Sequence, residues 1–229
     1  YKSILESLSQ AGTYNDYKVK THFINSEKLT EENVAEQLDR MSGIIICPGF
    51  GQRGTDGKLI AAKYCREKDK PTFGICLGMQ MAVVEYARHV LGLTGAHTSE
   101  VDPNTPYPVI DLMPDQQHID EKGGTMRLGK YPCRLSRDSV AFAAYGEENI
   151  FERHRHRYEF NNAYRDLFVE GGMRIGGVNP ERDLVEIVEL PNHPWFVGVQ
   201  YHPELRSRPD RPHPLFREFV GAALKAQEK

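Results

Sequence analysis

Residues 71–87 have the sequence PTFGICLGMQMAVVEYA, and they predict a buried strand, a very tight turn and then a helix. The first residues favour a strand, and apolar residues recur at helical spacing from position 82 onward. Between them stands Cys76, with Gly74 two residues before it and Gly78 two residues after it. This is the G-x-nucleophile-x-G pattern of a nucleophile elbow, with a thiol in place of the hydroxyl. Such a turn places Cys76 at a helix N-terminus, where the dipole favours the thiolate.

An isolated match to this pattern would also suit a buried structural cysteine in a Gly-bounded turn, so the rest of the sequence must distinguish the two. The chain has 229 residues, enough for one large α/β domain or two small ones. Apolar residues make up 39% and charged residues 27%, both ordinary for a globular protein. The net charge of −3 gives no overall attraction to nucleic acid or to anionic membranes.

Targeting and redox signals are few. No apolar run approaches the length of a membrane span, and the first residues do not form a signal peptide. The four cysteines lack the paired spacing of a disulfide framework, which favours a reducing, cytoplasmic setting. Residues 1–10 already have the apolar spacing of an amphipathic helix, and we therefore expect the chain to be a fragment of a longer protein.

Strand-like and helical segments alternate over the first 90 residues, with strands expected at 17–24, 43–47 and 72–75. This alternation predicts a parallel sheet with helices on both faces. Beyond it lie a polar stretch at 115–123 and short antiparallel strands within 125–135. No linker or repeat divides the chain. We predict one α/β domain over residues 1–229, with three layers and a mostly parallel central sheet.

The final strand of this sheet leads into residues 199–204, VQYHPE. On an extended backbone His202 and Glu204 project to the same side, and Pro203 between them stiffens the chain. A carboxylate beside an imidazole fixes its tautomer and stabilises the imidazolium formed in turnover. Because Cys76 also lies at a strand end, where open α/β sheets place their sites, the sequence predicts a Cys-His-Glu triad for acyl transfer. The alternative is a surface ion pair without a catalytic role.

The segment Gly49–Gly54, GFGQRG, allows two interpretations. It fits the G-x-G-x-x-G dinucleotide fingerprint between a strand and a helix, with Asp69 about twenty residues beyond its start as a ribose-binding acid. It also fits an oxyanion hole, in which a backbone N–H of this loop joins that of Leu77. A strand and a helix precede the loop, and the next strand ends at Cys76, so we favour the oxyanion hole.

Residues 153–157, RHRHR, are dense in positive charge. They could form a nucleic-acid patch, although the protein is acidic overall. His154 and His156 could ligate a metal ion, but two histidines do not complete a ligand set. An arginine holding a substrate carboxylate is the third use, and guanidinium geometry suits it.

Together these stretches resemble the class I (triad) glutamine amidotransferases, and within them the glutaminase domains of the CTP synthase family. Residues 74–80, GICLGMQ, match the nucleophile motif of the class. The stretches that resemble CTP synthases in particular are 98–100 (TSE), 123–129 (GGTMRLG), 152–159 (ERHRHRYE) and 191–196 (PNHPWF). The glycine loop departs from the usual Pro-Gly-Gly-Phe-Gly, because Pro48 stands where a glycine is common.

This resemblance implies a class I glutamine amidotransferase fold and roles for particular residues. Cys76 would be the nucleophile, with His202 and Glu204 completing the triad. The resemblance alone adds Glu100 to the substrate site. The residues expected to hold glutamine are Gly49, Leu77, Gly78, Met79, Gln80, Glu100 and Arg157.

The resemblance further implies that glutamine is hydrolysed to glutamate and ammonia through a γ-glutamyl thioester. The ammonia would serve the ATP-dependent amination of UTP to CTP in a synthetase domain that this sequence lacks, together with the opening strand of the glutaminase domain. No cofactor is expected in this domain, since ATP and Mg²⁺ would bind the synthetase domain. The expected partners are L-glutamine, that synthetase domain and further copies in a tetramer, with no nucleic acid and no membrane. Two alternatives remain: a stand-alone γ-glutamyl hydrolase, and a dinucleotide-binding module built on Gly49–Gly54.

Overall fold

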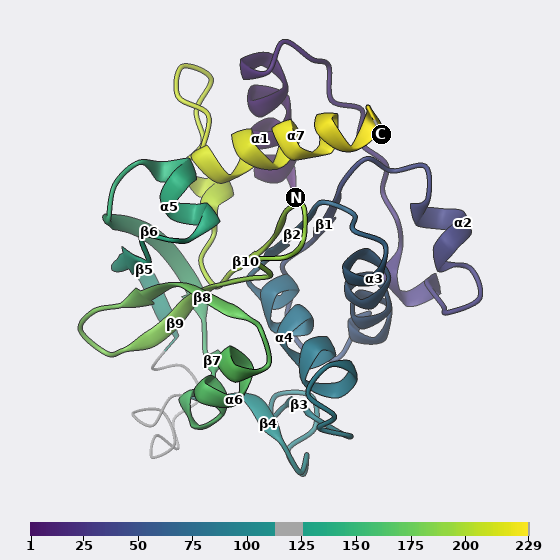
Figure 1. Cartoon of the computed structure of the whole chain (residues 1–229), viewed down its shortest axis with the longest axis vertical. Helices are drawn as coiled ribbons and strands as arrows, with labels where there is room; N and C mark the ends of the chain where they lie inside the picture. Colours follow the sequence, from purple (N-terminus) through teal and green to yellow (C-terminus); the bar gives the residue numbers. More distant parts are fainter. Residues whose placement is uncertain (113–125, 229) are drawn as a thin grey trace.

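The computed structural model describes residues 1–112 and 126–228 and contains a seven-stranded sheet in the order β1-β2-β10-β9-β8-β5-β6 (Figure 1). A smaller sheet has the order β3-β4-β7. The strands are β1 (Ile44–Ile46), β2 (Thr72–Ile75), β3 (His97–Thr98), β4 (Pro108–Leu112), β5 (Arg127–Leu135), β6 (Asn149–His156), β7 (Tyr158–Phe160), β8 (Arg174–Asn179), β9 (Leu184–Glu189) and β10 (Phe196–Val199).

Helices cover both faces of the large sheet. The helices are α1 (Lys2–Tyr14), α2 (Val34–Leu38), α3 (Thr55–Glu67), α4 (Leu77–His89), α5 (Val140–Tyr145), α6 (Arg165–Glu170) and α7 (Pro214–Gln227). Apolar residues of α1, α5 and α7 share one core cluster with Phe73 and Ile75 of β2. Residues of α2, α3 and α4 pack with Ile46 of β1 and Phe196 of β10 on the opposite face. The predicted three-layer α/β architecture is confirmed, with helices on both faces.

The large sheet is mixed, so the expectation of a mostly parallel sheet is wrong. Parallel pairing is confined to β1, β2 and β10, and the remaining pairs in the order above are antiparallel. Parallel neighbours require a long crossover, which α3 provides between β1 and β2. Residues 180–183 join β8 to β9, and residues 190–195 join β9 to β10. Such short connections produce antiparallel neighbours.

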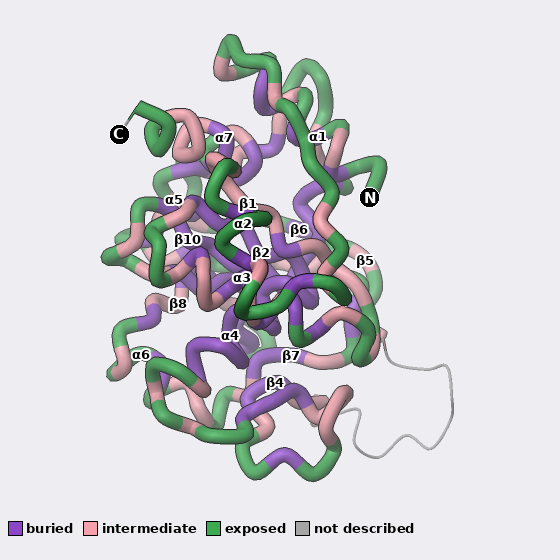
Figure 2. The backbone as a smooth tube through the Cα atoms, turned by 90° about the vertical axis from the view of Figure 1, so that its right-hand side faces the viewer, coloured by how far each residue is buried: buried purple, intermediate pink, exposed green. Residues whose placement is uncertain are grey.

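The turn from β2 into α4 lies at the centre of the molecule. Figure 2 shows β2, β10 and α4 as buried backbone. Gly74 lies so close to the first turn of α4 that an added Cβ would be 2.9 Å from the carbonyl group of Gly78. A Cβ on Gly78 would collide with the carbonyl oxygen of Ile46 in β1. Both glycines are therefore required for close backbone approach between the helix and two strands.

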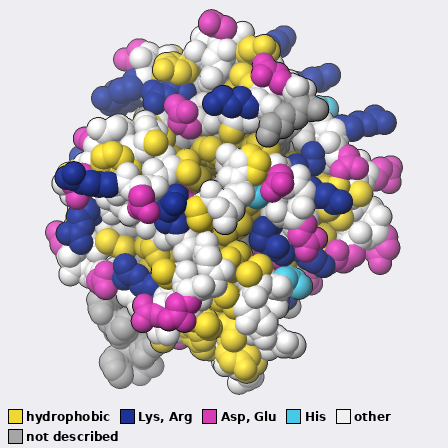
Figure 3. All heavy atoms as spheres, in the orientation of Figure 1, with side chains coloured by type: hydrophobic (Ala, Val, Ile, Leu, Met, Phe, Trp, Pro, Cys, Tyr) yellow, Lys and Arg dark blue, Asp and Glu magenta, His cyan; other side chains and the backbone are white. Residues whose placement is uncertain are grey.

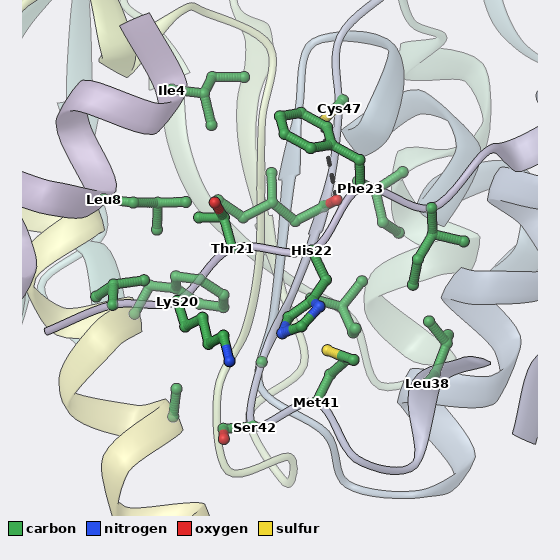
Figure 4. A pocket seen from close by; sticks show the side chains of 18 of the residues that line it. Ile4, Leu8, Lys20, Thr21, His22, Phe23, Leu38, Met41, Ser42 and Cys47 are labelled. Atoms are coloured by element: carbon green, nitrogen blue, oxygen red, sulfur yellow. Dashed lines mark hydrogen bonds between the residues drawn. The ribbon is translucent and has the colours of Figure 1, made fainter. Parts of the chain in front are cut away.

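Residues Tyr17–Ile24 form no strand, contrary to the sequence prediction. A strand needs a neighbour to complete its backbone hydrogen bonds, and β1 pairs with β2 only. A cavity of about 500 Å³ is lined by both this segment and β1. Figure 4 shows Ile4 and Leu8 of α1 at this cavity, together with Phe23 and Cys47. The side chain of Phe23 is 74% exposed, so the apolar lining is open to solvent.

Two further predictions concern residues 115–135. The polar stretch 115–123 and the first residue of the strand expected at 125–128 lie outside the described residues. From Arg127 onward the expected short strands merge into the single strand β5, which pairs antiparallel with β6. Within residues 1–112 and 126–228, no helix combines the length and apolar character needed to cross a membrane.

Substituting Gly78→Ala should lower the free energy of unfolding by about 1–3 kcal/mol, because the added methyl group overpacks the contact with Ile46. Urea denaturation at fixed pH measures the change. Gly221→Ala in α7 is the matched control, since an added Cβ there meets only Asn15 Oδ1 at 3.5 Å. In that helix alanine should be neutral or slightly stabilising. Equal stability of the two variants would contradict the close-approach interpretation.

Candidate active site

Cys76 occupies a strained position between the end of β2 and the start of α4. Its backbone has φ 52° and ψ −107°, a left-handed conformation that a non-glycine residue rarely adopts. Its N–H donates to the carbonyl oxygen of Val199 in β10 at 2.8 Å. The side chain is only 3% exposed, and it lines a cavity beside the N-terminus of α4. The predicted elbow thus has the expected geometry at the expected residue.

His202 and Glu204 follow the neighbouring strand β10. His202 Nδ1 lies 2.7 Å from Glu204 Oε1, and both side chains are largely buried. The two residues do not lie on an extended strand, as the sequence suggested, because Pro203–Leu205 forms one turn of 3-10 helix. Proline is well suited to the first position of such a turn. The pair forms all the same, and the N–H of His202 is anchored to the carbonyl oxygen of Arg153 at 2.8 Å.

The environment of His202 favours its protonated form. Burial alone would lower the pKa of His202, but the nearby Cys76 sulfur and the Glu204 carboxylate raise it to about 10. The hydrogen bond to Glu204 engages Nδ1, while the buried Nε2 has no hydrogen-bond partner in the structure. This arrangement leaves Nε2 available to exchange a proton with the sulfur or with a leaving group.

A cavity of about 270 Å³ opens beside the sulfur. It brings together five of the predicted site residues: Gly49, Cys76, Gln80, Glu100 and Arg157. Its other lining residues are Phe50, Met126, His156 and Tyr158.

Three predicted binding residues do not line this cavity. Leu77 and Met79 direct their side chains into an apolar cluster, and Gly78 packs against Ile46. Any contact they make with a ligand would come from the backbone N–H groups in the first turn of α4, which have no partner inside the helix.

The glycine loop after β1 is tied to the cavity through Glu100. Glu100 Oε1 accepts a hydrogen bond from the N–H of Gly51 at 3.2 Å. At the start of the loop Lys58 Nζ donates to the carbonyl oxygen of Cys47 at 2.7 Å. Burial lowers the pKa of Lys58, while the thiols of Cys47 and Cys76 raise it. The loop is therefore held on both sides near Cys76.

The dinucleotide alternative fits this geometry poorly. A fingerprint loop needs an open helix N-terminus for the pyrophosphate. Here an added Cβ at Gly57, in the first turn of α3, would collide with the backbone of Ser26, so Ser26 covers that turn. The nearby Glu100 carboxylate would also repel a pyrophosphate.

The basic run at 153–157 alternates across β6. His154 and His156 are buried and hydrogen bonded to each other at 2.8 Å, while the three arginines of the run are exposed. Burial lowers the pKa of both histidines, that of His156 to about 3. Among the described residues no group of His, Cys, Asp and Glu side chains is placed to hold a metal ion. On the face shown in Figure 3, charges of both signs are interspersed.

A buried charge cluster supports the cavity from β5, β7 and β9. Arg127 Nη2 lies 2.5 Å from Glu186 Oε1, and Arg127 Nη1 lies 3.5 Å from Glu159 Oε1. Burial raises the pKa of Glu159 to about 8 and that of Glu186 to about 7, although Arg127 opposes both shifts. His156, which lines the cavity, lies 3.7 Å from Glu159. The cluster thus supports the cavity wall through the contact between Glu159 and His156.

Reasoning from residue patterns missed two residues near the sulfur. Glu100 follows β3 in a segment without a motif, and only the family resemblance had pointed to it. Gln200 follows β10, and its amide Nε2 lies 3.7 Å from Cys76 Sγ. In the sequence Gln200 is only an amide at the end of an apolar strand, two residues before His202. Its burial and its contact with Cys76 are seen only in the structure.

Comparison with known proteins shows the family of this chain. The family Glutamine amidotransferase class-I matches residues 1–222. CTP synthase of Clostridium kluyveri is 58% identical over 229 residues, and that of Bacteroides thetaiotaomicron is 60% identical over 228. Each match covers 100% of this chain, but only 43% and 42% of the relative. The chain thus spans less than half the length of these curated relatives.

A solved structure supports the same assignment. It is described as the Trypanosoma brucei CTPS glutaminase domain with bound acivicin, and it aligns with a TM-score of 0.93 at 33% identity. The alignment covers 98% of this chain and 88% of that one. The chain therefore belongs to the class I glutamine amidotransferases, and within them to the glutaminase domains of CTP synthases.

Proposed function

We propose that this chain hydrolyses L-glutamine to glutamate and ammonia through a covalent thioester on Cys76. The observation that carries the proposal is the meeting of two strand ends. Cys76 follows β2, and the His202–Glu204 pair follows the adjacent parallel strand β10. The cavity beside Cys76 is not lined by His202 or Glu204, but it carries an acid and a base for an amino acid, Glu100 and Arg157. Family membership supports the same reaction.

In the proposed mechanism the Cys76 thiolate attacks the γ-carboxamide carbon, forming the C–S bond. The oxyanion is held by backbone N–H groups near Gly49 and Leu77. Protonated His202 gives its proton to the departing nitrogen as the C–N bond breaks, and ammonia leaves. Neutral His202 then takes a proton from water, which attacks the thioester and releases glutamate. Glu204 keeps the imidazole oriented and stabilises its charge throughout.

The charged groups of the cavity account for recognition of the substrate. Arg157 is suited to the α-carboxylate, since a guanidinium can bind it through two hydrogen bonds. Glu100 is suited to the α-ammonium group. The backbone of residues 77–80 and the side chain of Gln80 would hold the γ-carboxamide end. The charged groups and the neutral amide groups would thus hold opposite ends of the substrate and align it with its amide toward Cys76.

We further propose that the ammonia serves the ATP-dependent conversion of UTP to CTP in a synthetase domain of the same polypeptide, with ATP and Mg²⁺ bound there. We place this enzyme, as a tetramer, in the cytoplasm, a location supported by the four free cysteines. The chain on its own should hydrolyse glutamine only weakly, because contact with the synthetase domain would help to close the site.

A stand-alone hydrolase of γ-glutamyl bonds is the second candidate, since the same triad would serve it. The likeness to CTP synthases over the whole chain favours the amidotransferase. Dinucleotide binding at Gly49–Gly54 is disfavoured because Ser26 covers the start of α3.

Acivicin or another electrophilic glutamine analogue should form a single adduct on Cys76, and excess glutamine should prevent it. Peptide mass spectrometry after digestion identifies the modified residue. The other thiols should stay unmodified, because burial raises the pKa of Cys47 and Cys133 and that of Cys65 to about 12.

The matched variants for this labelling are Cys76→Ala, which should abolish it, and Cys47→Ala, which should retain it. Adducts spread over the other cysteines, or labelling that glutamine does not prevent, would show that the elbow is only a structural turn.

Replacing Glu204 by Gln should lower kcat about 10²–10⁴-fold, since the imidazolium loses its carboxylate. The stability effect should depend on pH. The folded-state pKa of His202, about 10, exceeds its ordinary 6.5, so protonation stabilises the fold fully below about pH 6.5. This stabilisation disappears as the pH rises to about 10. The excess unfolding free energy of the wild type over Glu204→Gln should therefore shrink across that range.

Chemical denaturation at several pH values measures this difference. Glu218→Gln, at an exposed surface pair with Arg217, is the control and should give a flat profile. A difference that grows with pH would contradict the assigned coupling between His202 and Glu204.

Arg157→Lys should raise the KM for glutamine about tenfold and change kcat less, because lysine keeps the charge but loses the paired hydrogen bonds. Steady-state ammonia release measures both constants. Arg153→Lys, exposed on the same side of β6 but outside the cavity, should leave KM unchanged. An unaltered KM in Arg157→Lys would remove this residue from the proposed carboxylate site.

A further inference from the structure

Gln200 is a fully buried amide placed directly against the candidate nucleophile. It follows the last residue of β10, and its side chain has 0% exposure. Its Nε2 lies 3.7 Å from Cys76 Sγ, within the range of an N–H···S hydrogen bond. Its backbone N–H donates to the carbonyl oxygen of Glu186 in β9 at 2.9 Å. The amide is thus anchored by the sheet and directed at the sulfur.

The orientation of this amide follows from a chain of hydrogen bonds. The carbonyl oxygen of Tyr158 can only accept, so Gln80 must turn its NH₂ group toward it, at 2.9 Å. The same Nε2 donates its second proton to Gln200 Oε1 at 3.1 Å. If the Gln200 amide were flipped, two NH₂ groups would face each other. The amide nitrogen of Gln200 must therefore be the atom that faces Cys76.

A hydrogen-bond donor beside the sulfur would lower the free-energy cost of burying a thiolate there. Cys76 belongs to an apolar core cluster and is almost fully buried, so a thiolate there has little access to water. An anion without solvent is costly unless hydrogen bonds replace the lost hydration. Hydrogen bonds to an ionised acceptor are stronger than neutral ones, so Gln200 interacts more strongly with the thiolate than with the thiol.

We propose that Gln200 positions the nucleophile: its amide holds the Cys76 sulfur toward the cavity and stabilises the thiolate before glutamine is attacked. This inference deepens the proposed function and rests on Cys76 being the nucleophile. Gln80 acts through Gln200, because it fixes the orientation of that amide. The arrangement links the sulfur to Tyr158, which lines the same cavity beside Arg157.

The opposing interpretation is that Gln80 and Gln200 merely satisfy each other in the core. Both interpretations predict lower stability when the pair is broken, so stability does not separate them. The reactivity of the Cys76 thiol does. Its rate of alkylation by iodoacetamide, followed on the Cys76 peptide by mass spectrometry, reports the thiolate population without requiring glutamine to bind.

Gln200→Met keeps the volume and removes the donor. The midpoint of the alkylation rate against pH should move upward by about one pH unit, the tenfold change expected for one hydrogen bond to a charged group. With glutamine, kcat should fall about tenfold while KM stays within about threefold. Val197→Ala, in the same buried strand but away from the sulfur, is the control for core damage and should leave the midpoint in place.

Gln200→Glu provides the second test. Should Gln200→Met not fold, the result with Gln200→Glu is decisive. It keeps an acceptor for Gln80 but turns a carboxylate oxygen toward the sulfur, so the midpoint should rise further than in Gln200→Met. An unchanged midpoint in a folded Gln200 variant would overturn the inference. If the midpoint shifts but no glutamine analogue reacts, the positioning role holds and the substrate assignment fails. If glutamine prevents labelling of Cys76 but the midpoint does not shift in the Gln200 variants, the substrate assignment holds and the positioning role fails.

Discussion

The structure depends on a backbone constraint at Cys76. A non-glycine residue with positive φ costs about 1–3 kcal/mol and persists only when its surroundings fix it. Here Val199 of β10 holds the amide, and Gly74 and Gly78 allow α4 to pack tightly on β1 and β2. The strain has a consequence for chemistry, because the sulfur cannot relax away from the helix N-terminus. The backbone conformation of Cys76 therefore determines both how α4 packs in the core and where the sulfur lies.

The pairing of β10 with β2 brings the residues of the candidate site together. Because β10 is parallel to β2, the two strands end at the same edge of the sheet, and residues distant in sequence meet there. On its other side β10 is antiparallel to β9. β10 therefore lies where the sheet changes from parallel to antiparallel pairing, and the residues that follow it supply both Gln200 and the His202–Glu204 pair. Cys76 and the His202–Glu204 pair are thus rigidly related through one strand pair.

The sequence predicted what is local and missed what depends on long-range placement. Cys76 and the His202–Glu204 pair were found because short patterns encode an elbow and an acid beside an imidazole. The antiparallel pairing of most strands was not predicted, because the length of the connections, and not the alternation of strands and helices, decides between parallel and antiparallel pairing. The strand expected at Tyr17–Ile24 failed because the segment faces a cavity instead of a neighbouring strand. Glu100 was accessible only by resemblance, and Gln200 only through the structure.

The distribution of charge within the site follows from burial. Arg157 is exposed at the cavity and Glu100 is partly exposed, a placement that suits the proposed binding of a zwitterion. Apart from His202, the side chains that contact the buried sulfur or support that contact are the neutral amides of Gln200 and Gln80, since a permanent charge there would be costly without a partner. In the proposed mechanism the charges beside the sulfur arise together, as thiolate and imidazolium. Each would then stabilise the other, while Glu204 would offset the cost of burying the imidazolium.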